Sequence, residues 1–261
     1  MRPQFARRIQ HLFSPEGESA VAAIMQRRPL LAFDFDGTLA PIVATPDLAR
    51  VPLPVSSRLR KLREVLQLAV ITGRSVEDVK PRLDFDPQFI IGSHGAQDGL
   101  VDRERALEAG LNPVRELLAW RSDDLTRTGV TVEDKRLSLA LHYRLSRDPD
   151  GAQKLIAELV PARLKGLRVV PGKMVVNIVH EDAPDKGQAL HDLLRRCDAG
   201  SAIFVGDDVN DEPVFRMAQP SWLTVRVGRD TARSAASFCL DGGFDLVLFL
   251  DRLLQHLNRR A

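Results

Sequence analysis

The sequence has few cysteines, little excess charge and no long apolar run, and each of these features narrows the functions that remain. Its 261 residues include only two cysteines, Cys197 and Cys239, with no CxxC pair and no histidine cluster at zinc-ligand spacing. We therefore expect two reduced thiols in a cytoplasmic protein, without a disulfide framework or a zinc site. The formal net charge is only +2 and no basic run stands out, which gives no reason to expect a nucleic-acid partner.

The longest apolar runs, such as 68–71 and 202–205, are much shorter than the ~20 residues that a membrane-spanning helix needs. We therefore expect no membrane association. The arginines among the first eight residues resemble those of a transit peptide, but no apolar stretch of the signal-peptide type accompanies them and Glu16 follows closely. We interpret this segment as a short amphipathic helix within an N-terminal helical extension, residues 1–28.

Two different secondary-structure patterns divide the chain. In the first, short apolar runs alternate with helical patterns, which is typical of a parallel sheet covered on both faces. The predicted strands are 30–33, 68–71, 89–91 and 202–205, and the predicted helices are 55–66 and 186–197. In the second, strands are grouped together, which favours an antiparallel sheet with helices on one face. Its predicted strands are 130–133, 137–143, 167–170 and 174–180, with helical patterns at 103–125 and 151–164.

The grouped strands predict a second domain inserted into the first. Gly, Asp and Pro cluster where the chain crosses between the two patterns, near 93–100 and 181–185. We expect a catalytic core formed by 1–98 and 183–261, and an inserted cap domain formed by 99–182. We also expect hinges at the two crossings that allow open and closed states, since closure would exclude water from a reaction site.

Polar residues follow three of the predicted core strands. Asp34 and Asp36 come after the first strand, Thr72 comes after the second, and Asp207 comes after 202–205. Because the carboxyl ends of parallel strands meet at one edge of a sheet, these residues are expected to converge on one pocket.

Such a group of carboxylates needs a cation. Two unit charges 4 Å apart repel by about 4 kcal/mol at an effective dielectric constant near 20, and a phosphate dianion would be repelled more strongly. Carboxylate oxygens suit Mg²⁺, which can neutralise them and bind a phosphate oxygen. Lys186, just before a helical pattern, can add a second positive charge. The pattern therefore predicts a magnesium-dependent phosphoryl site.

Four motifs carry a family resemblance. DFDGT at 34–38, Thr72 in ITGR, Lys186 in DKG and GDDVND at 206–211 resemble, in order and spacing, the motifs of the haloacid dehalogenase (HAD) superfamily. The resemblance implies an α/β fold, with a HAD-like Rossmannoid parallel-sheet core and an inserted α/β cap of the C2B type. It also implies phosphatase rather than dehalogenase chemistry, because an acid stands at the position of Asp36.

The resemblance also implies roles. Asp34 would be the nucleophile that forms an aspartyl-phosphate, and Asp36 would protonate the leaving oxygen and then activate water. Thr72 would hydrogen-bond the phosphate, and Lys186 would balance its charge.

The implied Mg²⁺ ligands are Asp34, the backbone carbonyl of Asp36, and Asp207. Asp208 and Asp211 would be outer ligands or orienting groups. For these last two, helix capping or a surface position is the alternative, because Asp is favoured at helix starts.

Four further stretches resemble trehalose-6-phosphate phosphatases: GSHGAQ at 92–97, VEDKRLSLALHYR at 132–144, PGKMVVNIVHEDAPDKGQAL at 171–190 and GDDVNDEPVF at 206–215. The similarity runs from about residue 30 to residue 228 and implies hydrolysis of trehalose 6-phosphate to trehalose and phosphate. By matching positions, the substrate-binding candidates are His94, Glu133, Lys135, Arg144, Lys173 and Asn177.

Asn177 departs from the family pattern, because a glutamate is usual there. Asparagine offers one acceptor and one donor group, where glutamate accepts from two hydroxyls. Asn177 therefore keeps a phosphatase of sucrose phosphate or of a glycosyl phosphoglycerate as an alternative. A sugar phosphomutase, which also occurs with this type of cap, is a second alternative. A regulatory module without activity is a third, and the intact set of Asp34, Asp36, Lys186 and Asp207 argues against it.

For three of the cap candidates, a role without any contact to substrate is the alternative. Glu133 and Lys135 could be solvated charges on a strand, and Arg144 could form a structural salt bridge. We interpret His142 as structural, because a lone histidine more often is.

Overall fold

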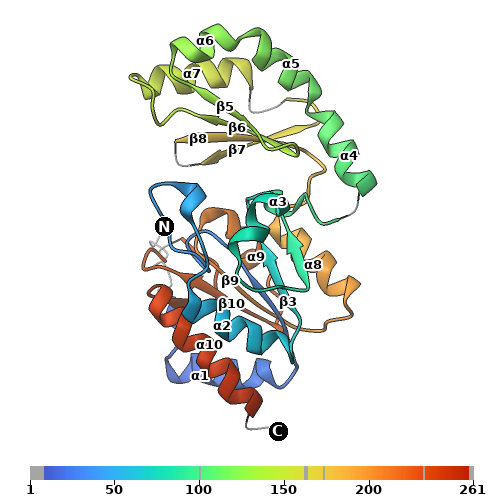
Figure 1. Ribbon diagram of the computed structural model, residues 1–261, viewed down its shortest axis with the longest axis vertical. Coiled ribbons are helices and arrows are strands. Elements are labelled where there is room, and N and C mark those ends of the chain that lie inside the picture. The colour runs from blue at the N-terminus through green and yellow to red at the C-terminus, as the bar shows by residue number, and fades with distance from the viewer. Residues whose placement is uncertain (1–8, 100, 162–163, 173, 232, 259–261) are drawn as a thin grey trace, which may run out of the picture. The chain divides into compact units, whose positions relative to one another are not determined.

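The computed structural model describes residues 9–99, 101–161, 164–172, 174–231 and 233–258 (Figure 1). The chain forms two compact units. Unit 1 comprises the residues up to Asp98 together with those from Pro184 onward, and unit 2 comprises Gly99–Ala183.

Unit 1 is built on a parallel sheet. Its described strands are β1 (Gln10–His11), β2 (Leu30–Phe33), β3 (Leu68–Ile71), β4 (Phe89–Ile91), β9 (Ala202–Gly206), β10 (Trp222–Val227) and β11 (Phe238–Leu240). They pair in the order β1-β11-β10-β9-β2-β3-β4, and every pairing is parallel. All residues of β2, β3 and β9 are buried, as expected of central strands covered on both faces.

Helices cover the two faces of this sheet. The helices of unit 1 are α1 (Pro15–Met25), α2 (Leu53–Arg63), α3 (Val76–Val79), α8 (Lys186–Arg196), α9 (Glu212–Met217) and α10 (Gly243–Asn258), with 3₁₀ turns η1 (Pro46–Leu48), η2 (Lys80–Arg82), η3 (Ser93–Gly95) and η4 (Val209–Asp211). Leu31 and Phe33 of β2 pack in the cluster formed with α1, α2 and α10, whereas Ala32 packs in the cluster formed with α8 and α9. The alternation of side chains along the strand therefore produces two hydrophobic cores, one on each face of the sheet.

Unit 2 is an antiparallel sheet with helices packed against one face. Its strands are β5 (Thr131–Asp134), β6 (Ser138–His142), β7 (Leu167–Gly172) and β8 (Val175–His180), paired in the order β5-β6-β8-β7. Its helices are α4 (Val101–Gly110), α5 (Asn112–Trp120), α6 (Ser122–Arg127) and α7 (Pro149–Leu159). Leu139, Leu141 and Ile178 pack against Val114 of α5 and Ile156 of α7 in one core. The opposite face carries the polar side chains of Glu133, His142 and Asn177 beside the apolar Ala140 and Val179.

The predicted fold class is confirmed, with a parallel α/β core and a separate α/β unit. Among the described residues, no helix combines the length and the apolar character that crossing a membrane requires. No disulfide joins Cys197 and Cys239, both of which lie in the described part of the chain.

The start of the described chain differs from the expected amphipathic helix. Gln10 and His11 form β1, because the backbone of β11 offers an open edge and the Leu12 amide bonds the Cys239 carbonyl at 2.8 Å. Leu12 is fully buried, which fixes this pairing. The helix α1 follows only after Ser14, whose side chain accepts a hydrogen bond from the amide of Gly17 and caps the helix.

Candidate functional site

Three polar segments meet at the carboxyl edge of the unit 1 sheet. β2 lies between β3 and β9, so Asp34, Thr72 and Asp207 leave neighbouring strands at the same edge. The Asp34 amide donates to the carbonyl of Val205 at 2.9 Å, and this bond extends the β2–β9 pairing to the start of the site.

An acidic cluster forms at this edge. Asp34, Asp207 and Asp211 each place a carboxylate oxygen within 4.8 Å of the others. Burial, reinforced by Asp211 and Asp208, raises the pKa of Asp207 to about 6. Burial also raises the pKa of Asp34 well above its usual value, although Lys186 acts in the opposite direction. Burial is the main cause of both shifts, and repulsion between the neighbouring carboxylates adds to it.

Lys186 is the positive charge inside this cluster. It is the first residue of α8, and Asp185 caps the helix by accepting from the amide of Gln188. The Lys186 side chain is 1% exposed, and its Nζ lies 2.6 Å from Asp34 Oδ1 and 2.7 Å from Asp211 Oδ1. Burial lowers its pKa, but Asp211 and Asp34 more than offset this and hold the pKa above its usual value. The ammonium therefore stays charged and ties the nucleophile candidate to Asp211.

Asp211 organises the turn after β9. Its side chain is fully buried, and Oδ2 accepts hydrogen bonds from the amides of Asp207 at 2.9 Å and Asp208 at 3.0 Å. Gly206 leaves the room for it, because a Cβ there would lie 2.4 Å from the carboxyl carbon of Asp211. Asp208, in contrast, is exposed and accepts from the side chain of Asn210 at 3.3 Å. Of the two outer candidates, only Asp211 reaches the cluster.

A tight turn after Asp34 supports Asp207. Gly37 has φ +84°, and a Cβ at this position would lie 2.1 Å from Asp207 Oδ2, so glycine is required on both counts. The turn closes with a hydrogen bond from the Gly37 amide to the carbonyl of Ala40. It presents Thr38, whose hydroxyl donates to Asp207 Oδ1 at 3.2 Å.

The carboxylate of Asp36 is held by Arg74 instead of lying in the cluster. Nε and Nη2 of Arg74 donate to the two carboxylate oxygens of Asp36, each at 2.7 Å. Sequence reasoning placed Arg74 at the strand end but gave it no role. The pairing could have been predicted, because Arg74 comes two residues after Thr72 and therefore lies at the same edge of the sheet as Asp36.

Thr72 and His94 lie beside each other in unit 1. Thr72 is fully buried, and its backbone carbonyl accepts from the amide of His94 at 2.9 Å. The His94 ring packs where a side chain on Gly73 would point, since a Cβ there would lie 2.4 Å from Cε1 of the ring. Ser93 and His94 both have positive φ, at 50° and 59°. Strained backbone of this kind concentrates at functional sites.

Three cap candidates share the polar face of the unit 2 sheet. Glu133 pairs with Ala140, and Ala140 pairs with Asn177, so Glu133 and Asn177 point to the same side. Lys135 Nζ lies 3.4 Å from the carboxylate of Glu133. His142, also on this face, places Nε2 2.9 Å from Glu133 Oε2. Side chains two residues apart on a strand point to the same face, so the position of His142 two residues after Ala140 could have placed it on this face from sequence alone.

The remaining cap candidates are less defined. Arg144 is exposed, and no ion pair joins it to another residue in the described part of the chain. The side chain of Asn177 donates to the carbonyl of Val170 at 3.5 Å, a long contact. Lys173 lies outside the described residues.

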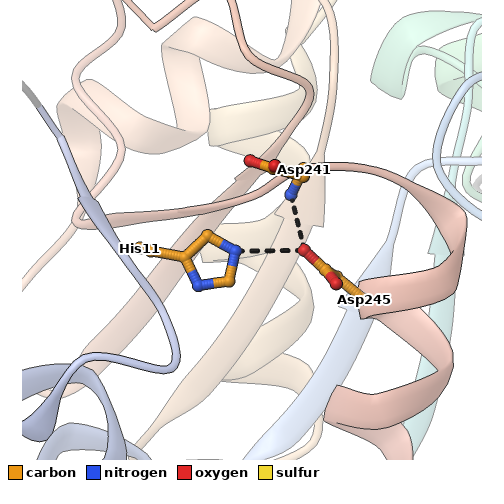
Figure 2. Close-up of side chains that lie close together, drawn as sticks. All are labelled: His11, Asp241 and Asp245. Atoms are coloured by element: carbon orange, nitrogen blue, oxygen red, sulfur yellow. Dashed lines mark hydrogen bonds and ion pairs between the residues drawn. The ribbon is translucent and has the colours of Figure 1, made fainter.

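A second group of possible metal ligands lies at the far edge of the unit 1 sheet (Figure 2). His11 Nε2 lies 3.0 Å from Asp245 Oδ2, which also accepts from the amide of Asp241 at 2.9 Å. The carboxylate of Asp241 pairs with Arg229 at 3.0 Å. These contacts fasten β1 to the start of α10, which is a structural role.

The first cluster, in contrast, suits a hard divalent cation. Its donors are carboxylate oxygens, three carboxylates face the one ammonium of Lys186, and their repulsion adds to burial in raising the pKa values of Asp34 and Asp207. A divalent cation would relieve this excess, and oxygen ligands of this type favour Mg²⁺ or Ca²⁺ over softer metals.

Comparisons with known proteins agree with this arrangement. The trehalose-phosphatase family model matches residues 32–240. A trehalose-phosphate phosphatase of Mycobacterium avium is 33% identical over 249 residues, which is 89% of this chain and 64% of that protein. An uncharacterized glycosyl hydrolase of Mycobacterium tuberculosis is 35% identical over 243 residues, which is 87% of this chain but 18% of that protein.

Solved structures show the same fold. The C-terminal domain of a C. albicans trehalose-6-phosphate phosphatase has a TM-score of 0.74 at 19% identity, covering 95% of this chain and 98% of that one. A protein related to trehalose-6-phosphate phosphatase has a TM-score of 0.71 at 23% identity, covering 89% of this chain and all of that one. This chain thus spans less than two thirds of the curated relatives, but the family model covers most of its length. The chain belongs to the trehalose-phosphatase family.

Proposed function

We propose that this protein is a Mg²⁺-dependent phosphatase that hydrolyses trehalose 6-phosphate through an aspartyl-phosphate on Asp34. The observation that carries the proposal is the cluster of the buried Asp34 and Asp211 and the partly buried Asp207, with Lys186 between them, at the carboxyl edge of the sheet. The family match supports the substrate.

In the first half of the reaction, an Asp34 carboxylate oxygen attacks phosphorus and the bond between phosphorus and the sugar oxygen breaks. Asp36 gives its proton to that leaving oxygen. Lys186 neutralises part of the charge around the nucleophile, and Thr72 donates to a phosphate oxygen. Asp34, Asp207 and the backbone carbonyl of Asp36 would hold Mg²⁺, which supplies positive charge for the phosphate oxygens.

In the second half, water attacks the phosphorus of the aspartyl-phosphate. Asp36, now a carboxylate, takes a proton from this water, and the bond from phosphorus to Asp34 breaks. Inorganic phosphate and the free Asp34 carboxylate result, so one residue serves as acid and then as base.

We propose that unit 2 supplies the contacts to the sugar. Glu133 and Asn177 share its polar sheet face and suit hydroxyl groups as partners, and Lys135 and Arg144 add cationic donors. His94, from unit 1, and Lys173 complete the proposed set.

The test is release of phosphate from trehalose 6-phosphate, with Mg²⁺ and with a chelator. We expect turnover only with the metal, and a loss of at least about 10³-fold in Asp34→Asn, because the nucleophile is removed. Asp86→Asn is the matched control, since Asp86 is an aspartate with an 81% exposed side chain that pairs with Arg63. Turnover by Asp34→Asn at the rate of this control would refute the proposal.

Asn177 favours a second candidate, a phosphatase of sucrose phosphate or of a glycosyl phosphoglycerate. Its amide already donates to the carbonyl of Val170, which leaves the side-chain oxygen to accept from a sugar hydroxyl. Measuring kcat/KM for the three sugar phosphates in parallel separates the candidates, and a preference for either rival over trehalose 6-phosphate would replace our assignment.

A further inference from the structure

The side chain of Arg74 makes four hydrogen bonds beside the site, yet the reaction described above does not use it. It follows Thr72 and Gly73 in the loop after β3. Four of its five N–H donors are occupied: two by Asp36, one by Asp78 and one by the carbonyl of Pro46. A guanidinium committed in this way is not available to bind the phosphate of a substrate.

The Asp36 carboxylate depends on Arg74 for its direction. Its side chain is 45% exposed, so packing alone does not fix its rotamer. Both oxygens accept from Arg74 at 2.7 Å, a bidentate geometry that fixes the plane of the carboxylate. No other hydrogen bond to this carboxylate occurs among the residues that the structure describes. Arg74 is therefore what sets the position of the proposed acid and base.

Arg74 is itself anchored firmly. Its side chain is 12% exposed, and the guanidinium lies 5.3 Å from the ring centroid of the fully buried Phe35. Nη1 donates to Asp78 Oδ2 at 2.7 Å. Its backbone is fixed at both ends, because its amide donates to the Thr72 hydroxyl and its carbonyl accepts from Ser93.

A second arginine, Arg82, binds Asp78, the residue that anchors Arg74. Arg82, 7% exposed, donates to the Asp78 carboxylate and to the carbonyl of Asp47. Partial burial acts to raise the pKa of Asp78, but hydrogen bonds from Arg82 and Arg74 lower it below its usual value. Arg82 shares the partner of Arg74 without touching Asp36, which makes it a matched control.

We propose that Arg74 is a positioning residue that aims the Asp36 carboxylate at the leaving oxygen in the first half of the reaction and at water in the second. This role rests on the proposed function. Arg74 hydrogen-bonds both Thr72, the proposed phosphate contact, and Asp36, the proposed proton donor. The loop after β3 therefore positions both residues relative to each other.

The leaving group separates this role from a merely structural one. 4-Nitrophenolate leaves phosphorus without a proton, so formation of the aspartyl-phosphate from 4-nitrophenyl phosphate does not need Asp36. Hydrolysis of that aspartyl-phosphate still needs Asp36 as base. A sugar alkoxide needs the proton in the first half as well.

The experiment compares the wild type with Arg74→Lys, Asp36→Asn and Arg82→Lys by rapid mixing with Mg²⁺. With 4-nitrophenyl phosphate, we expect Arg74→Lys and Asp36→Asn to release close to one nitrophenolate per enzyme at the wild-type rate and then turn over about 10²-fold more slowly. With trehalose 6-phosphate, kcat of Arg74→Lys should fall about 10²-fold while KM stays unchanged, because Arg74 does not touch substrate. Arg82→Lys should remain within a few-fold of the wild type.

Two results would overturn the inference while leaving the proposed function intact. One is an Arg74→Lys protein that behaves like Arg82→Lys. The other is an Arg74→Lys protein that loses its initial burst, since this means general damage to the site. If Arg74→Lys does not fold, Asp78→Asn replaces it, because it weakens the anchor of Arg74 without touching Asp36. Asp78→Asn should keep the initial burst and lower the subsequent turnover about tenfold. A wild type that is inactive on both esters refutes the proposed function itself.

Discussion

Replacing Lys186 with methionine keeps most of the side-chain volume but removes the ammonium that lies inside the acidic cluster. Asp34 and Asp211 then lose charge-assisted hydrogen bonds of 2.6 and 2.7 Å. Neither carboxylate can turn to water for compensation, because Asp34 is 4% exposed and Asp211 is 0% exposed. The structure therefore predicts a large loss of stability in the metal-free protein.

The magnitude follows from two considerations. Removing one partner of a buried ion pair typically costs about 3–5 kcal/mol. The two carboxylates have oxygens within 4.8 Å of each other, and at an effective dielectric constant of 20 their unscreened repulsion is about 3 kcal/mol. The cost of breaking the ion pair and the repulsion between the carboxylates are two estimates of the same loss, so they are not added. We expect Lys186→Met to lower the free energy of unfolding by about 3–5 kcal/mol at neutral pH.

The assay is urea unfolding in the presence of a chelator. The chain has two tryptophans, the buried Trp222 of β10 and the 79% exposed Trp120 of unit 2, so a Trp120→Phe background reports unit 1 alone. Lys61→Met, at an exposed position on α2 of unit 1, is the matched control and should change the free energy by less than about 0.5 kcal/mol.

A double-mutant cycle tests the cause of this loss. Adding Asp34→Asn to Lys186→Met removes one of the repelling charges and should restore about 1–3 kcal/mol. A cost below about 1 kcal/mol for Lys186→Met, or no recovery in the double variant, would refute the electrostatic reasoning.

Three further predictions concern other parts of the molecule. Since the pKa of Asp207 is raised from 3.8 to about 6, the folded protein holds a proton there that the unfolded chain has lost, so metal-free stability should fall as pH rises from about 4 to 6. Mg²⁺ affinity, measured by calorimetry, should rise over the same range, and a flat profile would contradict the assignment. Asn177→Glu should raise the ratio of kcat/KM for trehalose 6-phosphate to that for sucrose phosphate, and an unchanged ratio would remove Asn177 from the sugar site. Asp245→Ala should lower the free energy of unfolding by about 1 kcal/mol, through the lost contact with His11, and leave the Mg²⁺ dependence of activity intact.

The central strands could be predicted from sequence because each is a short apolar run that ends in a polar motif. Their predicted positions at 30–33, 68–71 and 89–91 agree with β2, β3 and β4. Asp34, Thr72 and Asp207, which were predicted to lie at one edge of the sheet, follow the neighbouring strands β2, β3 and β9 at that edge. This prediction succeeded because strand direction in a parallel sheet is fixed by the alternation with helices.

Other features depend on long-range contacts that no local pattern contains. β1 is only two residues long and exists because β11 offers it an edge, so Gln10 and His11 had no strand signal of their own. No helix or strand was predicted beyond residue 205, although α9, β10, β11 and α10 lie there. The pairing of Arg74 with Asp36 joins residues 38 positions apart and appears only when β2 and β3 are placed side by side.

The most direct test of the account is detection of the phosphoryl group on Asp34. Asp36→Asn, mixed with 4-nitrophenyl phosphate and Mg²⁺ and quenched in acid, should yield a peptide that carries one phosphoryl group at Asp34, because the base needed for hydrolysis is missing. The same peptide from Asp34→Asn should carry none. An unmodified Asp34 in a sample that has released one nitrophenolate per enzyme would contradict the account.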